Sequence, residues 1–265
     1  MTTTTNSRSG EKGFTLVELS IVMIIIGLLI GGILKGQELI ANARLAANVS
    51  KVKAVDAALN TFRDSYSGLP GDLINNVNVL PNCATTSKCG EVAGNGDGRI
   101  GVGPGAAQAT ATENLTAWAQ LATTNLISGV TNSPSGTTAA AGVTNPVNEL
   151  GGMITIGYAV GNATLPGITG TTATARAGQY LALKTTATTA SSATVGLVLT
   201  PNQASRIDLK LDDGAPNSGS VLGAGAVAAV ATPAIVGCAD TNAAGSPYHT
   251  TWQGIGCSLY VLVQQ

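Results

Sequence analysis

One carboxylate in this sequence lies where an ionised side chain is costly. Glu18 is the only charged residue in the apolar run from Phe14 to Leu34. A charge in a membrane-spanning helix costs about 2.5 to 3.5 kcal/mol at mid-bilayer and less near an end, so such residues usually have a function and a partner. Phe14 and Glu18 are four residues apart, on one helix face. A cut between Gly13 and Phe14 would place a new α-amino group there; the alternative is a charge tolerated near the interface.

A second group of polar residues lies in the glycine-rich stretch 94–101, GNGDGRIG. Asn95 and Asp97 are weak candidates for calcium ligands, but the position expected for a bidentate glutamate holds Pro104. The same stretch contains one G-x-G-x-x-G match, which indicates a dinucleotide site only between a strand and a helix of a βαβ unit. Because no such unit is predicted here, we expect a surface turn.

Two adjacent acids and the single histidine complete the chemically active residues. Asp212 and Asp213 precede Gly214 and could bind a metal ion or act as acid and base. Adjacent carboxylates at a helix end are more often turn and capping residues, and we favour that interpretation. His249 has no accompanying nucleophile motif. The sequence therefore predicts no enzyme activity and no cofactor.

The four cysteines form two local pairs, Cys83 with Cys89 and Cys238 with Cys257. An even number at loop-like spacing in an exported chain predicts two disulfides, although four cysteines allow three connectivities. Zinc is the alternative, but neither pair has a second ligand pair beside it. We predict local pairing because it keeps each bridge within one loop or sheet edge.

The composition limits the class of protein. Of 265 residues, 44% are hydrophobic and only 10% are charged, and the net charge is −1. Soluble domains carry about 25% charged residues, so this balance suits a packed or surface-displayed structural protein better than a cytosolic enzyme. The sequence has no Lys/Arg cluster, which argues against a dedicated nucleic-acid site.

The elements that position these residues begin with one long helix. The run 14–34 can span a hydrocarbon core of about 30 Å at about 1.5 Å per residue. Beyond Lys35 the apolar residues recur every three or four positions, which predicts an amphipathic continuation to about Ser65. The sequence Gly68-Leu-Pro-Gly71 is expected to end this helix.

Shorter elements are predicted in the remainder of the chain. We expect a helix over 112–128, a second helix from the cap Thr200-Pro201 to about Lys210, and strands at 153–160, 179–183 and 258–263. The Thr/Ala/Ser/Gly-rich stretches between them are expected to be loops or edge strands.

Charges flanking the apolar run predict its orientation. Arg8 and Lys12 precede it, so the positive-inside rule places residues 1–13 in the cytoplasm and the chain beyond Lys35 outside. A secretory signal would have a shorter apolar region followed by a small-residue cleavage site, and no A-x-A follows this run.

The segment Gly13-Phe-Thr-Leu-Val-Glu18 resembles the N-terminal motif of type IV prepilins and type II secretion pseudopilins. The resemblance implies that a prepilin peptidase cuts after Gly13, that Phe14 becomes the N-methylated mature terminus, and that Glu18 acts in filament assembly. Many pilins carry a proline where this chain has Lys35. The nearby glycines, Gly27, Gly31, Gly32 and Gly36, could either loosen the helix or allow close helix packing.

The resemblance implies an α+β, pilin-like fold, with the long N-terminal helix packed on a small antiparallel sheet. It divides the chain into a cleaved leader (1–13), a transmembrane and filament-core segment (14–34), an amphipathic continuation (35–66) and a globular domain (67–265). FRDSYSGLPGDL, AWAQL and IDLKLDDGAPNSG also resemble segments of pilin-like proteins. In pilins a C-terminal loop near the sheet is often closed by a disulfide or by calcium, and Cys238 and Cys257 are similarly placed.

The implied function is that of a structural subunit in a homo-oligomeric helical filament. Its implied partners are the prepilin peptidase, an inner-membrane assembly platform and the membrane itself, through residues 14–34. The precursor would lie in a bacterial inner membrane, and the mature protein in a surface or periplasmic filament. The alternatives are a minor pilin, adhesin or pseudopilin that binds a surface, DNA or a secreted substrate, and a membrane-anchored sensor or hydrolase.

Overall fold

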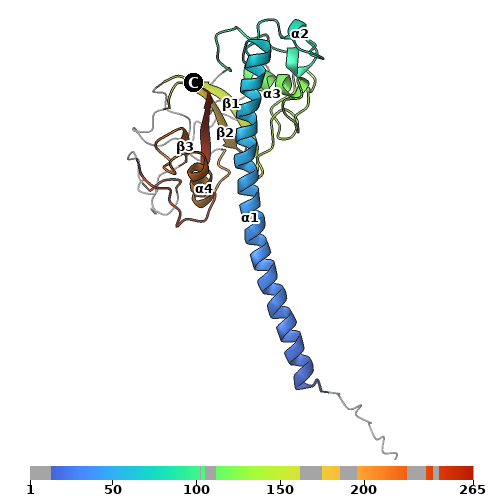
Figure 1. The fold of residues 1–265 in the computed structure, drawn as a ribbon, viewed down its shortest axis with the longest axis vertical. Coiled ribbons are helices and arrows are strands. Elements are labelled where there is room, and N and C mark those ends of the chain that lie inside the picture. Colours follow the sequence, from blue (N-terminus) through green and yellow to red (C-terminus); the bar gives the residue numbers. More distant parts are fainter. Residues whose placement is uncertain are drawn as a thin grey trace, which may run out of the picture. The chain divides into compact units, whose positions relative to one another are not determined.

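The computed structural model describes residues 13–101, 103–104, 112–161, 175–185, 196–225, 237–240 and 245–264. The chain divides into two compact units, Met1–Ala43 and Arg44–Gln265. Helix α1, Leu16–Tyr66, is unbroken and contributes to both (Figure 1). Arg8 and Lys12 lie outside the described residues.

The first unit contains an exposed apolar helix. Every residue from Gly13 to Lys35 is exposed. Within α1, the most apolar window has a mean hydropathy of 2.6, and by length and composition the helix can cross a membrane. The glycines near Lys35 do not interrupt α1. Burial within this chain therefore does not explain the apolar run.

In the second unit α1 buries one face, as its sequence periodicity predicts. The buried side chains recur every three or four residues and belong to one hydrophobic core: Leu45, Val49, Val52, Val55, Leu59 and Phe62. The helix ends at Tyr66 because Ser67 adopts a left-handed conformation, with φ 55°, and its N–H bonds the carbonyl of Arg63 at 2.8 Å. The helix therefore ends two residues before Gly68, the first residue of the predicted Gly-Leu-Pro-Gly signal, with Ser67 between them.

A four-stranded antiparallel sheet supplies the other side of this core. Its strands are β1 (Met153–Ala159), β2 (Gly178–Lys184), β3 (Val221–Ala224) and β4 (Ser258–Gln264), in the order β1-β2-β4-β3. Alternate residues point to opposite faces. Leu181 and Leu183 join the core that contains α1, whereas Tyr180 and Ala182 join a second, smaller cluster. The strand β3, a short edge strand, was not individually predicted.

Three further helices and a 3₁₀ turn complete the described fold: α2 (Asn76–Val79), η1 (Lys88–Gly90), α3 (Glu113–Thr123) and α4 (Pro201–Leu211). The helix α3 is shorter than predicted, with Asn125 in a left-handed conformation just beyond it. The predicted cap of α4 is present, because Thr200 and Gln203 form a reciprocal capping box. Disulfides join Cys83 to Cys89 and Cys238 to Cys257, the two pairs expected from the spacing.

Candidate functional site

The N-terminus of α1 is closed by a capping box between Thr15 and Glu18. The Glu18 carboxylate accepts bonds from the backbone N–H of Thr15 at 2.9 Å and from its hydroxyl at 3.0 Å. The Glu18 N–H in turn donates to the Thr15 hydroxyl oxygen at 3.2 Å. In an α-helix the first N–H groups have no partner within the helix. The side chain of each residue therefore accepts a hydrogen bond from the backbone N–H of the other, and this capping box marks the start of the helix.

This contact gives Glu18 a partner within its own chain, which the sequence analysis did not identify. The available signal was the pattern T-x-x-E directly before an apolar run, which is the sequence signature of a capping box. The sequence predicted only one partner for Glu18, the α-amino group of Phe14, which lies one helical turn away on the same face. Thr15 is thus an additional residue of the site, and it positions the carboxylate at the helix start.

Neither residue at the predicted cleavage position has a packing role in the described structure. The Phe14 side chain is 91% exposed. Apart from Gly13 and its two chain neighbours, no described atom lies within 4 Å of the position that a Cβ on Gly13 would occupy. Packing among the described residues therefore does not require a glycine at position 13.

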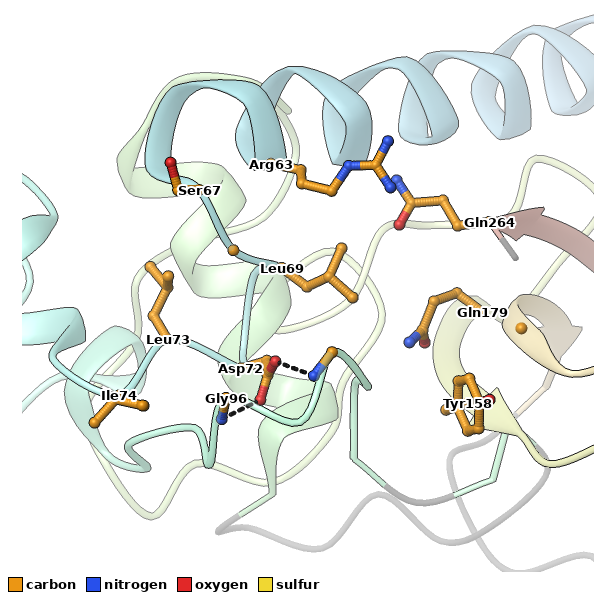
Figure 2. A pocket seen from close by; sticks show the side chains of 13 residues that line it. Arg63, Ser67, Leu69, Asp72, Leu73, Ile74, Gly96, Tyr158, Gln179 and Gln264 are labelled. Carbon is orange, nitrogen blue, oxygen red and sulfur yellow. Dashed lines mark hydrogen bonds between the residues drawn. The ribbon is translucent and has the colours of Figure 1, made fainter.

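The glycine-rich stretch 94–101 binds a carboxylate of its own chain. Asp72 accepts hydrogen bonds from the N–H groups of Gly96, Asp97 and Gly98 at 2.7, 3.2 and 2.8 Å. The bond from Gly96 can be followed in Figure 2. Gly96 and Gly98 have φ values of 75° and 77°, a region that other residues rarely adopt. Successive N–H groups in such a turn form a site for an anion, and here Asp72 fills it.

The calcium candidates of this stretch act as turn residues. The Asn95 side chain accepts from the N–H of Asp97 at 2.8 Å, and that of Asp97 accepts from the N–H of Arg99 at 2.9 Å. Glu113 binds the N–H of Gly101 at 2.7 Å from the first turn of α3. Burial is the main cause that raises the pKa of Glu113. Asp72 and Glu113, which sequence reasoning missed, hold the loop.

The second pair of candidates, Asp212 and Asp213, lies beside the buried Asp208. The three carboxylates have oxygens within 4.8 Å of one another, and they are the one group of this kind within the described residues that could hold a metal ion. Asp208 accepts from the Tyr248 hydroxyl at 2.8 Å and from the N–H of Gly214 at 3.2 Å. Burial, opposed by these bonds, raises the pKa of Asp208 to about 7.

The two neighbouring acids each have partners in the turn that leads to β3. Asp212 accepts from the N–H groups of Ser220 and Val221. Asp213 accepts from the N–H of Ala215 at 2.9 Å and from the Ser218 hydroxyl at 2.6 Å. These contacts are those of turn residues, as favoured from the sequence. The spacing of the acids in the sequence did not identify Asp208 as a member of this group. Helix α4 places its carboxylate close to those of Asp212 and Asp213.

The fold and the helix start define a class of protein. The chain is an α+β protein with a long apolar N-terminal helix and a small antiparallel sheet. Residues 8–34 match the family described as Prokaryotic N-terminal methylation motif, the signature of type IV pilins and pseudopilins. The match covers the segment containing Gly13, Phe14 and Glu18. Comparisons with curated proteins and with solved structures returned no match.

Proposed function

We propose that this protein is a structural subunit of a type IV pilus-like filament. It is cut between Gly13 and Phe14, methylated at the new terminus, and assembled through the helix 14–34. The observation that carries the proposal is the methylation motif at residues 8–34, which lies over a helix that is apolar and exposed within this chain. The motif is typical of structural proteins rather than enzymes.

The exposed apolar surface of the first unit supports assembly. Monomeric soluble proteins rarely expose large contiguous apolar patches, and such patches mark membrane or protein contacts. From Phe14 to Leu34 this surface would face lipid in the precursor and the helices of other subunits in the filament. Gly13 has no packing role among the described residues, which supports a requirement imposed by the peptidase that cuts after it.

The Glu18 carboxylate provides the specificity of assembly in this proposal. After the cut, the amine of Phe14 on an incoming subunit pairs with Glu18 of a subunit already in the filament. Two unit charges about 4 Å apart at an effective dielectric of 20 attract by about 4 kcal/mol, and desolvation offsets part of this. The pair sets register more than it adds stability. The bond between Glu18 and the Thr15 N–H holds the carboxylate in place before docking.

The other proposed partners are the membrane, the peptidase and the assembly platform that act before the subunit enters the filament. The precursor is anchored in the bacterial inner membrane by residues 14–34, with residues 1–13 in the cytoplasm and the globular domain 67–265, joined through the amphipathic segment 35–66, outside. The prepilin peptidase removes the leader, and an inner-membrane assembly platform moves the mature subunit into a surface or periplasmic filament. Abundance of the protein in sheared filaments distinguishes a main pilin from a minor pilin or a secretion pseudopilin.

Processing is tested with Gly13→Val, which should leave an uncut precursor because a branched side chain clashes in a peptidase site shaped for glycine. Gly10→Val, three residues earlier in the leader, is the control and should be cut normally. Intact-mass measurement should show a mature wild-type protein that begins at N-methylated Phe14. A mature terminus after Lys35 would mean that the run is an ordinary signal.

Assembly is tested at Glu18 with variants that separate charge from capping. Glu18→Gln retains an acceptor for the Thr15 N–H but has no charge, and Glu18→Val retains neither. Both should be inserted and cut, yet form few or no filaments by electron microscopy, while Glu18→Asp should be intermediate. Ser20→Val, a polar residue of the same helix, should assemble normally. Normal filament yield from Glu18→Gln would contradict charge pairing.

A further inference from the structure

A cavity of about 510 Å³ lies at the end of α1, in the second unit. Its walls are the segment 67–74, the glycine-rich loop and the ends of three strands, β1, β2 and β4 (Figure 2). Pockets of about 300 to 1,000 Å³ are the usual size of small-molecule sites, which combine an apolar lining with a few placed polar groups. Leu69, Leu73 and Tyr158 provide apolar surface here.

Three of the polar side chains that line this cavity form one row across the sheet. Tyr158 of β1 lies opposite Gln179 of β2, and Gln179 lies opposite Gln264 of β4. Residues directly opposite on neighbouring strands share a face. On β2 the same face carries Leu181 and Leu183, both in the main core. Two amides therefore occupy positions where the pattern of the strands would place apolar residues.

A β-bulge puts the second glutamine into this row. The pairing of β2 with β4 is regular from Leu183↔Leu259 to Tyr180↔Leu262 but shifts at Gln179, whose partner is Gln264. Regular pairing would have placed Val263 opposite Gln179. Bulges re-aim side chains and are over-represented next to functional sites. The irregularity thus exchanges a valine for an amide on the wall of the cavity.

Three of the amide atoms in this row have no hydrogen-bond partner among the described residues. Gln179 is only 2% exposed, and both its Nε2 and its Oε1 are unpaired. Gln264 is 9% exposed; its Nε2 donates to Asn60 at 3.2 Å, which leaves its Oε1 unpaired. Figure 2 shows the Gln179 amide directed into the hollow and the Gln264 amide beside Arg63. A buried polar group without a partner costs about 1 to 3 kcal/mol, so a bound molecule that pairs with these atoms is stabilised by them.

The unpaired atoms specify the chemistry of that molecule. The two Oε1 atoms need donors and Nε2 of Gln179 needs an acceptor. A carboxylate or phosphate offers no donor when ionised, and an ammonium group offers no acceptor. A hydroxyl group offers both. We propose that this cavity binds a neutral, hydroxyl-rich ligand, a saccharide, through the amides of Gln179 and Gln264 and the ring of Tyr158.

The loops around the cavity favour a saccharide over a peptide. An extended peptide is usually recognised through main-chain hydrogen bonds. The N–H groups of Gly96 and Gly98, which line the cavity, are already bound to Asp72. Both oxygens of Asp72 are likewise engaged by these N–H groups. The polar side chains that remain in the lining are the two amides, the Arg63 guanidinium and the Ser67 hydroxyl, all of which can bond to hydroxyl groups.

The test is a titration of the full-length protein in an amine-oxide detergent, whose headgroup carries no sugar. The probes are D-glucose, D-galactose, N-acetyl-D-glucosamine and their disaccharides, compared with acetate, inorganic phosphate and a blocked tetrapeptide. We expect at least one saccharide to shift the side-chain NH₂ resonances of Gln179 and Gln264 saturably, and the other three probes not to. A second arm with immobilised surface polysaccharide distinguishes a polymer from a free sugar as the source.

Two variants and a control make the test specific. Gln179→Leu extends the apolar row of β2, so it should fold, melt no lower than the wild type and bind the saccharide at least tenfold more weakly. Gln179→Glu keeps an acceptor but loses the donor and should also weaken binding. Gln253→Leu, an exposed glutamine outside the cavity, should bind normally. The proposal is overturned if no saccharide in the panel saturates, if the peptide alone shifts these resonances, or if Gln179→Leu binds as the wild type does. The site does not depend on filament formation, so its failure leaves the proposed function intact.

Discussion

At the scale of single residues, Asp208 links the stability of the second unit to pH. Its carboxyl group is buried beside Asp212 and Asp213, and burial raises its pKa to about 7 from an ordinary value of 3.8. Between these values the folded state holds a proton that the unfolded state has released. Stability therefore falls as the pH rises through this window, by at most about 1.4 kcal/mol per pH unit for one group.

Asp208→Asn should remove this part of the pH dependence. An asparagine can still accept from Gly214 and can donate to the Tyr248 oxygen, so both contacts of the wild type are available. The wild-type melting temperature should fall between pH 5 and pH 8, and the variant should show a flatter profile with higher stability at pH 8. Asp64→Asn, on the exposed side of α1, is the control. An unchanged slope in Asp208→Asn would assign the pH dependence to other groups.

At the scale of elements, one carboxylate organises the glycine-rich loop. Asp72 accepts three backbone N–H groups, from residues 96, 97 and 98. Such loops bind phosphate in nucleotide sites because their N–H groups converge. In this protein the converging groups bind an acid supplied from the segment that follows α1, so the loop is a structural element.

Asp72→Ala should therefore destabilise the second unit by about 1 to 3 kcal/mol, the cost of leaving buried polar groups unpaired. Thermal and urea unfolding of the full-length protein in detergent measure the loss. The matched control is Asp97→Ala, because the Asp97 side chain accepts from Arg99 alone among the described contacts. Equal destabilisation by the two substitutions would contradict the central role of Asp72.

At the scale of the whole molecule, the division into two units has a consequence for solubility. The hydrophobic core contains residues from Leu45 onward, and the apolar helix from Phe14 to Leu34 contributes nothing to it. Removal of residues 1–43 should leave the second unit folded, soluble and monomeric without detergent, whereas the full-length protein should need detergent. Circular dichroism and size-exclusion chromatography with light scattering decide this. Aggregation or unfolding of the shortened chain would show that the apolar helix supports the second unit.

Local patterns in the sequence determined the long helix, its apolar first part and amphipathic second part, and several shorter elements. The apolar run and the three-to-four spacing beyond Leu45 are properties of one helix, and the capping residues of α4 are contiguous. The motif from Gly13 to Glu18 is likewise local. For these features neighbouring residues in the chain suffice, because α-helical geometry fixes which residues share a face.

Only the tertiary structure decided which distant residues meet. Asp72 and the loop at residues 96 to 98, and Asp208 and Tyr248, are brought together by packing between elements. The row containing Gln179 and Gln264 depends on strand register and on a bulge, and a shift of one residue would turn a side chain to the other face. Register and long-range pairing are set by the packed core as a whole, so no single stretch of sequence contains them.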